Sequence, residues 1–164
     1  MLVEISGVFV KITYALDADI PLMRGQAGRP AARFNRPGQD ALYLSPDEKS
    51  ARVAIGEYVR ADDPPRVLIH YEIERCNLLD LRHPEAASIY EQARQSWQDV
   101  LAKGGEPSSW DAADYIRRSG HVGLIDPSRQ RPGLWHITLL RWNEIGAPSV
   151  RQLKAPTPIF LKPK

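Results

Sequence analysis

The hydrophobic positions of the chain fall into short β-type runs and longer helical stripes. Apolar residues recurring at a 3.6-residue period predict one helix after residue 45, one over residues 85–103 and one from about residue 109 to residue 119. Runs rich in β-branched and aromatic residues predict strands at 8–14, 41–44, 66–73, 78–81, 121–125 and 134–142. Strands followed by helices and then strands again predict an α+β domain with a mixed or antiparallel sheet and flanking helices.

The first helix has a strong start signal. Ser45 can cap it, Pro46 suits the first helical position, and Glu48 completes a capping box.

Between the first strand and residue 41, residues 17–39 are rich in glycine, proline and arginine and predict a long loop. Loops of that length are uncommon in compact domains and are often functional. The proline-rich tail from residue 154 is expected to lie extended on the surface.

Composition narrows the class of protein. The 164 residues are 43% hydrophobic and 26% charged, which is typical of one globular domain, here residues 1–164. Cys76 is the single cysteine, so neither an internal disulfide nor a cysteine-based zinc site can form. The four histidines lack the spacing of common metal motifs, so we expect no metal.

No apolar run approaches the roughly 18 residues of a membrane-spanning helix, and the first residues do not resemble a signal peptide. We therefore expect a cytoplasmic protein with no membrane partner.

The charge distribution is more informative than the net charge of +2. Between residues 20 and 39 there are four arginines, Arg24, Arg29, Arg33 and Arg36, and no acid. A nucleic-acid-binding protein usually carries a broad basic face, whereas this chain has one local basic loop. The loop favours a small anionic ligand over a polynucleotide, because guanidinium groups pair with phosphate oxygens. From composition alone, a solvated basic loop explains the pattern equally well.

Two further residues can be interpreted either as part of a functional site or as ordinary structural residues. Glu57 lies at the edge of the apolar stripe of its helix, where it is either a surface glutamate with a packed stem or a carboxylate facing a site. Ser128 lies in a proline-bounded loop, where serine is most often a turn residue. No nucleophile elbow surrounds Ser128, so a serine hydrolase is disfavoured.

Taken in order, these segments resemble the RES domain family, which is named for an arginine, a glutamate and a serine. The resemblance rests on the strings at 32–38 (ARFNRPG), 41–45 (ALYLS) and 54–58 (AIGEY). It continues through 78–81 (LLDL), 107–110 (PSSW) and 123–128 (GLIDPS) and so spans essentially the whole chain.

The resemblance implies a fold similar to that of ADP-ribosyltransferases and a function as the toxin of a type II toxin–antitoxin system. It implies cleavage of the nicotinamide–ribose bond of NAD+, with inorganic phosphate or water as acceptor, and an Xre-like antitoxin as partner. Two alternatives remain open. One is transfer of ADP-ribose onto a protein such as phosphoribosyl pyrophosphate synthetase, and the other is a module that binds a nucleotide or a partner without chemistry.

Carried over by position, the resemblance assigns catalytic roles to Arg33, Tyr43 and Glu57. Arg33 would hold the pyrophosphate or an incoming phosphate, Tyr43 would stack on nicotinamide, and Glu57 would stabilise the developing positive charge on the ribose. Four further residues are expected to contact the NAD+, and these are Arg24, Asn35, Ser45 and Ser128.

The chain departs from the family pattern at three places. The two glycines before the family arginine are Ala31 and Ala32 here, and Tyr43 and Glu57 are fourteen residues apart, about one helical turn more than in many members. Many members also have an arginine near the first strand where this chain has Ala15, and Arg24 is the candidate replacement.

Overall fold

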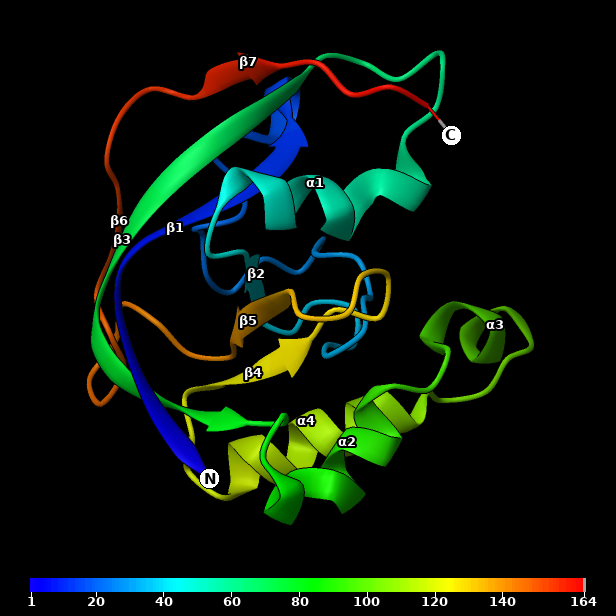
Figure 1. The fold of residues 1–164 in the computed structure, drawn as a ribbon, viewed down its shortest axis with the longest axis vertical. Helices are drawn as coiled ribbons and strands as arrows, with labels where there is room; N and C mark the ends of the chain where they lie inside the picture. The colour runs from blue at the N-terminus through cyan, green and yellow to red at the C-terminus, as the bar shows by residue number, and fades with distance from the viewer. Residues whose placement is uncertain (164) are drawn as a thin grey trace.

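A bent sheet forms the centre of the computed structural model, which describes residues 1–163 (Figure 1). The strands are β1 (Leu2–Tyr14), β2 (Leu42–Leu44), β3 (Arg66–Asp80), β4 (Gly123–Pro127), β5 (Trp135–Leu139), β6 (Val150–Gln152) and β7 (Thr157–Ile159). The helices are α1 (Glu48–Ile55), α2 (Ala87–Ala93), α3 (Trp97–Ala102) and α4 (Ser108–Arg118), with short 3-10 turns η1 (Ala15–Asp17), η2 (Gly56–Tyr58) and η3 (Pro84–Ala86).

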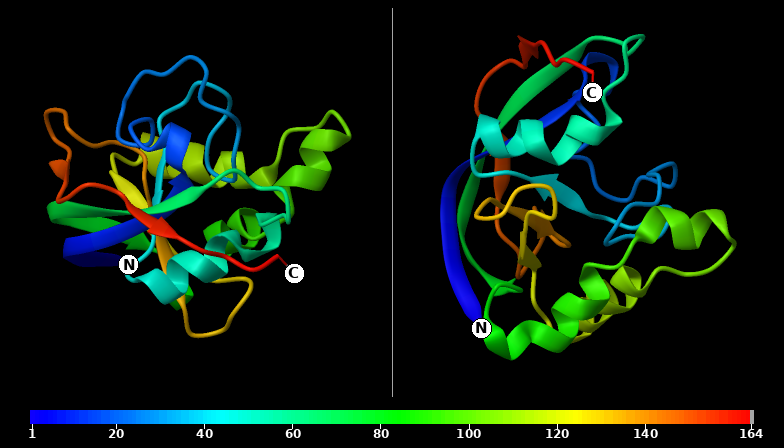
Figure 2. Two further views of the ribbon diagram at one scale, coloured as in Figure 1. Left: turned by 90° about the horizontal axis from the view of Figure 1, so that it is seen from above. Right: turned by 45° about the vertical axis from the view of Figure 1, so that its right-hand side comes forward.

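The sheet runs in the order β1-β3-β4-β5-β2, and β6 and β7 also pair with β3. Among the strands of residues 1–163, the β3–β4 pairing is parallel and the other pairings are antiparallel. Helices lie at both ends of this sheet, α1 at one end and α2 and α4 at the other (Figure 2). This arrangement confirms the predicted α+β class with a mixed, mostly antiparallel sheet and flanking helices.

Strand β3 is longer than the sequence pattern predicts. Two strands were expected at 66–73 and 78–81, but β3 is continuous and pairs with β1 from Tyr14↔Arg66 to Leu2↔Leu79. The polar stretch between the two apolar runs stays in the sheet because β1 pairs with its backbone. A register shift between Ile5 and Gly7, where Gly7 has φ 98°, absorbs the bend.

The predicted helix over 85–103 is wrong in its continuity. It is interrupted by Arg94, Gln95 and Ser96, which separate α2 from α3. Helix α2 packs Ala93, Ile89 and Tyr90 into a core cluster shared with α4, whereas α3 buries none of its residues. Periodicity alone cannot detect the break, because the apolar spacing continues across it.

The start of α1 also differs from the prediction. The residue that caps the helix is Asp47, whose Oδ1 accepts a 2.7 Å hydrogen bond from the Ser50 N–H. Ser45 instead forms a β-bridge with Val10, and both of its backbone groups are used in that bridge. The prediction that Ser45 caps α1 is therefore wrong, since pairing with β1 keeps this residue extended.

The long loop over residues 17–39 is held in place mainly by Arg29. Its guanidinium donates to the carbonyls of Ala41 at 2.9 Å and Met23 at 2.6 Å, and the Trp142 indole donates to Leu22 O at 2.9 Å. Residues 155–163 are extended as predicted, and they contribute β7 to the edge of β3. Within residues 1–163 no helix combines the length and apolar character needed to cross a bilayer.

Candidate functional site

A cavity of about 550 Å³ opens between α1, the α2–α3 connection, strands β2 and β5, and the loop after β4. This volume lies within the roughly 300–1,000 Å³ range of small-molecule sites. Figure 1 shows α1 and α3 on opposite sides of the loop that connects β4 to β5. Five of the seven residues singled out from the sequence line this cavity: Arg33, Tyr43, Ser45, Glu57 and Ser128.

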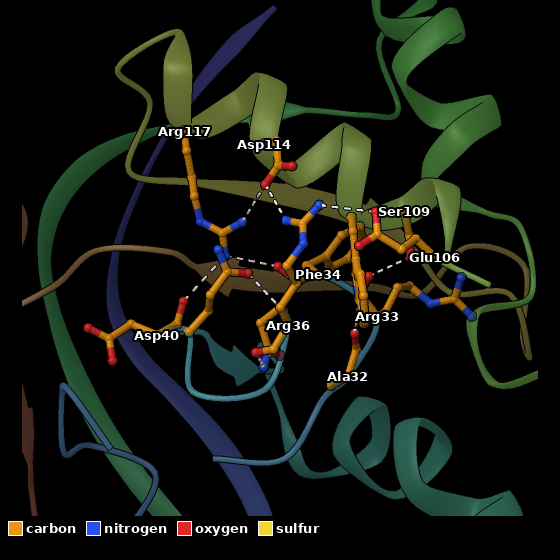
Figure 3. A network of polar contacts seen from close by, with 12 residues as sticks. Ala32, Arg33, Phe34, Arg36, Asp40, Glu106, Ser109, Asp114 and Arg117 are labelled. Carbon is orange, nitrogen blue, oxygen red and sulfur yellow. Dashed lines mark hydrogen bonds and ion pairs between the residues drawn. The ribbon is translucent and has the colours of Figure 1, made fainter. Parts of the chain in front are cut away.

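Helix α4 fixes the segment that carries Arg33 (Figure 3). Three consecutive carbonyls of that segment accept hydrogen bonds from α4 side chains. Ala32 O accepts from the Trp110 indole at 2.8 Å, Arg33 O accepts from the Ser109 hydroxyl, and Phe34 O accepts from Arg117 at 2.9 Å. Because the backbone is held on one side, the Arg33 side chain projects from a rigid base.

Arg36, the next arginine of the basic loop, completes this attachment. Its guanidinium donates to Asp114 Oδ1 at 2.9 Å and lies over the Trp110 ring, 5.2 Å from the centroid. Arg36 therefore fastens the loop to α4. It is not among the residues that line the cavity.

Arg33 connects the two walls of the cavity. Its Nη1 donates to the carbonyls of Ala93 at 2.9 Å and Gln95 at 2.7 Å, at the break between α2 and α3. None of the hydrogen bonds among residues 1–163 uses its Nε or Nη2, so these groups can donate to an anion. Burial lowers the Arg33 pKa to about 10, and the side chain therefore stays cationic at neutral pH.

Tyr43 is held by its hydroxyl. The hydroxyl donates to Asn35 Oδ1 at 2.7 Å and accepts from the Phe34 N–H at 2.9 Å, and burial raises its pKa well above the ordinary value. A phenol fixed in this way is not suited to move protons. Its ring, which lies near-parallel to the Phe34 ring with centroids 6.4 Å apart, is the part available for stacking.

Asn35 lies behind the site. Its side chain is 1% exposed, and besides Tyr43 it bonds the carbonyls of Pro30 and Arg36, each at 3.0 Å. It is not among the cavity-lining residues, so the structure places it as a support for Tyr43.

Glu57 and Ser128 face the mouth of the cavity. Glu57 lies in η2 and is exposed, and its Oε2 accepts a 3.3 Å hydrogen bond from the Gln130 amide in the β4–β5 loop. Ser128 Oγ accepts from the Arg131 N–H at 3.1 Å, an interaction that leaves the hydroxyl proton free for a ligand. Ser45 Oγ is already hydrogen-bonded to His136 Nδ1 at 2.9 Å.

Arg24 lies apart from the cavity. Its guanidinium is 3.9 Å from Glu144 on the surface, and it is not among the lining residues. The cation that the first strand contributes is Lys11, whose Nζ donates to Tyr43 O at 3.2 Å and lies 5.8 Å from the Tyr43 ring centroid. Burial and then the charge of Arg29 lower the Lys11 pKa to about 8.

Sequence analysis missed a buried carboxylate in the wall. Asp126 of β4 is 3% exposed, and its Oδ2 lies 3.1 Å from Arg129 Nη1. Burial raises the Asp126 pKa, and it lowers the pKa of His136, the residue opposite Asp126 in the β4–β5 register. The string GLIDPS contains Asp126, but only the pairing of β4 with β5 shows that this carboxylate lies opposite His136.

The lining as a whole favours a ligand that is both anionic and aromatic. The cationic residues Lys11, Arg33, Arg94 and Arg129 outnumber the acidic residues Glu57 and Asp126. The aromatic residues Tyr43, Tyr58 and Trp97 also line the cavity. Among residues 1–163, no three His, Cys, Asp or Glu side chains gather in a way that could hold a metal ion.

The fold and this lining define a nucleotide-sized, cationic site on a mixed sheet, and the comparisons with known proteins give its family. The sequence matches the RES domain model over residues 10–160. The chain therefore belongs to the RES domain family.

One solved structure in particular has a similar fold. It is the toxin–antitoxin complex MbcT–MbcA of M. tuberculosis, matched with a TM-score of 0.62 at 17% sequence identity. The match covers 96% of this chain and 86% of the other chain. A comparison with curated proteins gives no match.

Proposed function

We propose that this protein is the toxin of a toxin–antitoxin pair and that it cleaves the nicotinamide–ribose bond of NAD+. The observation that carries the proposal is the shared cavity. Four residues with roles implied by the RES resemblance, Arg33, Tyr43, Glu57 and Ser128, line it although they lie far apart in the sequence. A dinucleotide has the anionic centre and the two aromatic ends that this lining can bind.

The chemistry follows from the positions of these groups. The bond between the ribose anomeric carbon and the nicotinamide nitrogen breaks, and its electron pair leaves with neutral nicotinamide. The ribose then carries an oxocarbenium-like positive charge. The Glu57 carboxylate stabilises that charge and holds a ribose hydroxyl, and Arg33 binds the pyrophosphate through its free Nε and Nη2.

The acceptor completes the reaction from the open side of the cavity. An oxygen of water or of inorganic phosphate bonds to the anomeric carbon, and water loses a proton in the same step. Because Glu57 is exposed, the reacting carbon would be accessible to acceptors of different sizes. Transfer of ADP-ribose onto a protein oxygen or nitrogen is the second form of the same reaction.

The partner we propose is a cognate antitoxin of the Xre-like type. The similarity of fold to the toxin–antitoxin complex supports a toxin role, and a protein that covers the cavity mouth would block access to Glu57. We expect such a complex to act in the cytoplasm.

The test is proton NMR of the purified protein, free of antitoxin, with NAD+ in the presence and absence of inorganic phosphate. Nicotinamide release that requires phosphate identifies phosphorolysis, and release without phosphate identifies hydrolysis. Without release, addition of cell lysate and a search for ADP-ribose mass shifts tests protein transfer. Failure of both would overturn the enzymatic proposal and leave a binding module.

A further inference from the structure

Within the described residues, Trp97 differs from the other tryptophans because it has neither an indole hydrogen bond nor a place in a hydrophobic cluster. The indoles of Trp110 and Trp142 donate to backbone carbonyls, and Trp135 packs edge-on against Phe9. Trp97 is half-buried, belongs to none of the three hydrophobic clusters, and its Nε1 takes part in none of the hydrogen bonds among residues 1–163. Its surroundings instead include the cavity, which it lines.

The helix that carries Trp97 has no core of its own. Helix α3 buries none of its residues and protrudes from the body of the molecule (Figure 1). It is connected to the site through Arg33, whose Nη1 binds the carbonyls of Ala93 and Gln95 immediately before α3. The same arginine that we assign to the pyrophosphate therefore fixes the position from which Trp97 enters the cavity.

The lining of the cavity has two ends. Glu57 and Tyr58 line it from η2, directly after α1, whereas Trp97 lines it from the start of α3. Figure 1 shows α1 and α3 on opposite sides of the β4–β5 loop, and Arg33 binds the carbonyls of Ala93 and Gln95 at the α3 end. If the pyrophosphate is at Arg33 and the ribose that reacts is at Glu57, the far nucleoside lies toward Trp97.

We infer that Trp97 stacks on the adenine of the dinucleotide and so makes the site selective for substrates that carry an adenosine half. The inference rests on the proposed function for the orientation of the ligand. An indole is the largest aromatic face a protein offers to a base, and its free Nε1 can donate to a ring nitrogen or a ribose oxygen. Trp97 would thus be a specificity-determining residue, separate from the bond-breaking groups.

The experiment compares Trp97→Ala and Trp97→Phe with the wild type by calorimetric titration of ADP-ribose and of nicotinamide mononucleotide. Stacking on one base contributes about 1–3 kcal/mol, which corresponds to roughly a 5- to 150-fold change in affinity. We expect Trp97→Ala to weaken ADP-ribose binding by about tenfold or more and to leave nicotinamide mononucleotide binding within a factor of about two. Trp97→Phe should restore most of the lost affinity.

Leu101→Ala is the matched control, because Leu101 lies on the same helix and is not among the residues that line the cavity. It should leave both affinities unchanged. Equal losses for the two ligands in Trp97→Ala, or an equal loss in Leu101→Ala, would overturn the inference and make α3 a merely structural element.

Binding and turnover separate this inference from the proposed function. Selective loss of ADP-ribose binding in a protein that releases no nicotinamide would uphold the adenine site and refute NAD+ cleavage. Nicotinamide release by the wild type, together with unchanged ADP-ribose affinity in Trp97→Ala, would uphold NAD+ cleavage and refute the adenine site.

Discussion

The Tyr43 hydroxyl donates a 2.7 Å hydrogen bond to Oδ1 of Asn35, a side chain that is 1% exposed and lies behind the cavity. This hydrogen bond occupies the Tyr43 hydroxyl and fixes the ring, so Tyr43 offers the site an aromatic surface and not a proton-transfer group. The Asn35 amide is itself tied to two backbone carbonyls, so the ring of Tyr43 is set by the fold of the basic loop. Affinity for a flat ring benefits from such preorganisation.

Tyr43→Phe should therefore cost stability more than activity. The substitution leaves Asn35 Oδ1 and the Phe34 N–H without their partner in a buried place, a loss of about 1–3 kcal/mol. The ring remains, so NAD+ turnover should stay within a few-fold of the wild type. Urea unfolding and nicotinamide release measure the two effects, with Tyr115→Phe on the exposed face of α4 as the control. A large loss of turnover at unchanged stability would instead assign a chemical role to the hydroxyl.

Glu57→Gln should abolish turnover and leave NAD+ binding within a few-fold. The amide keeps the size of the side chain and its contact with Gln130, but it cannot stabilise an oxocarbenium-like charge. Glu48→Gln is the control, because Glu48 is an exposed glutamate at the start of α1 that pairs with Arg52 at 3.0 Å. Near wild-type nicotinamide release by Glu57→Gln would remove Glu57 from the mechanism.

Arg33→Ala should lower both the affinity for NAD+ and the stability of the protein. The change removes the donor to two backbone carbonyls at the end of α2 and removes the anion-binding guanidinium in one step. Arg33→Lys retains a charge but concentrates its donors on one nitrogen, whereas the guanidinium binds the carbonyls through Nη1 and offers Nε and Nη2 to a phosphate, so the lysine should recover little affinity. We expect the NAD+ KM to rise at least about tenfold in both variants, as for other lost charge-assisted hydrogen bonds.

Thermal unfolding and steady-state kinetics separate the two roles of Arg33. Arg151→Ala, which removes an exposed pair with Glu72 on the far strands, is the control and should change neither quantity. An unchanged KM in Arg33→Ala would contradict a role in ligand binding even if the melting temperature falls.

The sequence predicts most of the helices and strands and a large part of the candidate site, but only where a pattern lies within a short stretch of the chain. The strings around Arg33, Tyr43 and Glu57 are each contained within a few residues, and a pattern can detect them. Lys11 reaches the cavity through the bridge between Val10 and Ser45, and Asp126 reaches it through the pairing of β4 with β5. No local spacing in the sequence records those contacts.

The errors in the predicted elements have the same origin. Serine is a favoured helix-capping residue, but the backbone of Ser45 pairs with Val10 in a β-bridge. Asp47 caps α1 instead. The helix predicted over 85–103 is broken after Ala93, where the carbonyls of Ala93 and Gln95 accept hydrogen bonds from Arg33, about sixty residues earlier in the chain. In both places a tertiary contact overrides a local preference.

Lys11 should make the stability of the protein rise with pH in the alkaline range. Its pKa is lowered from the ordinary 10.5 to about 8, chiefly by burial. Between these two values the unfolded chain holds a proton that the folded chain has released, so the free energy of unfolding increases with pH. Below about pH 8 both states are protonated, and the contribution of Lys11 no longer changes. Lys11→Met should remove this slope, measured as the difference between the urea midpoints of the two proteins from pH 7 to pH 10.

Deprotonation of Lys11 should have the opposite effect on ligand binding, where affinity falls as pH rises. The Lys11 ammonium adds to the positive potential that Arg33 and Arg129 create in the cavity, so NAD+ affinity should fall as pH rises through about 8. In Lys11→Met the affinity should be lower at pH 7 and nearly independent of pH up to 9, whereas the exposed Lys103→Gln should follow the wild-type curve. Calorimetric titration with ADP-ribose measures this without turnover. A wild-type affinity that is flat across pH 7–9 would show that Lys11 does not face the phosphates, and its buried charge would then serve only to hold the Tyr43 carbonyl.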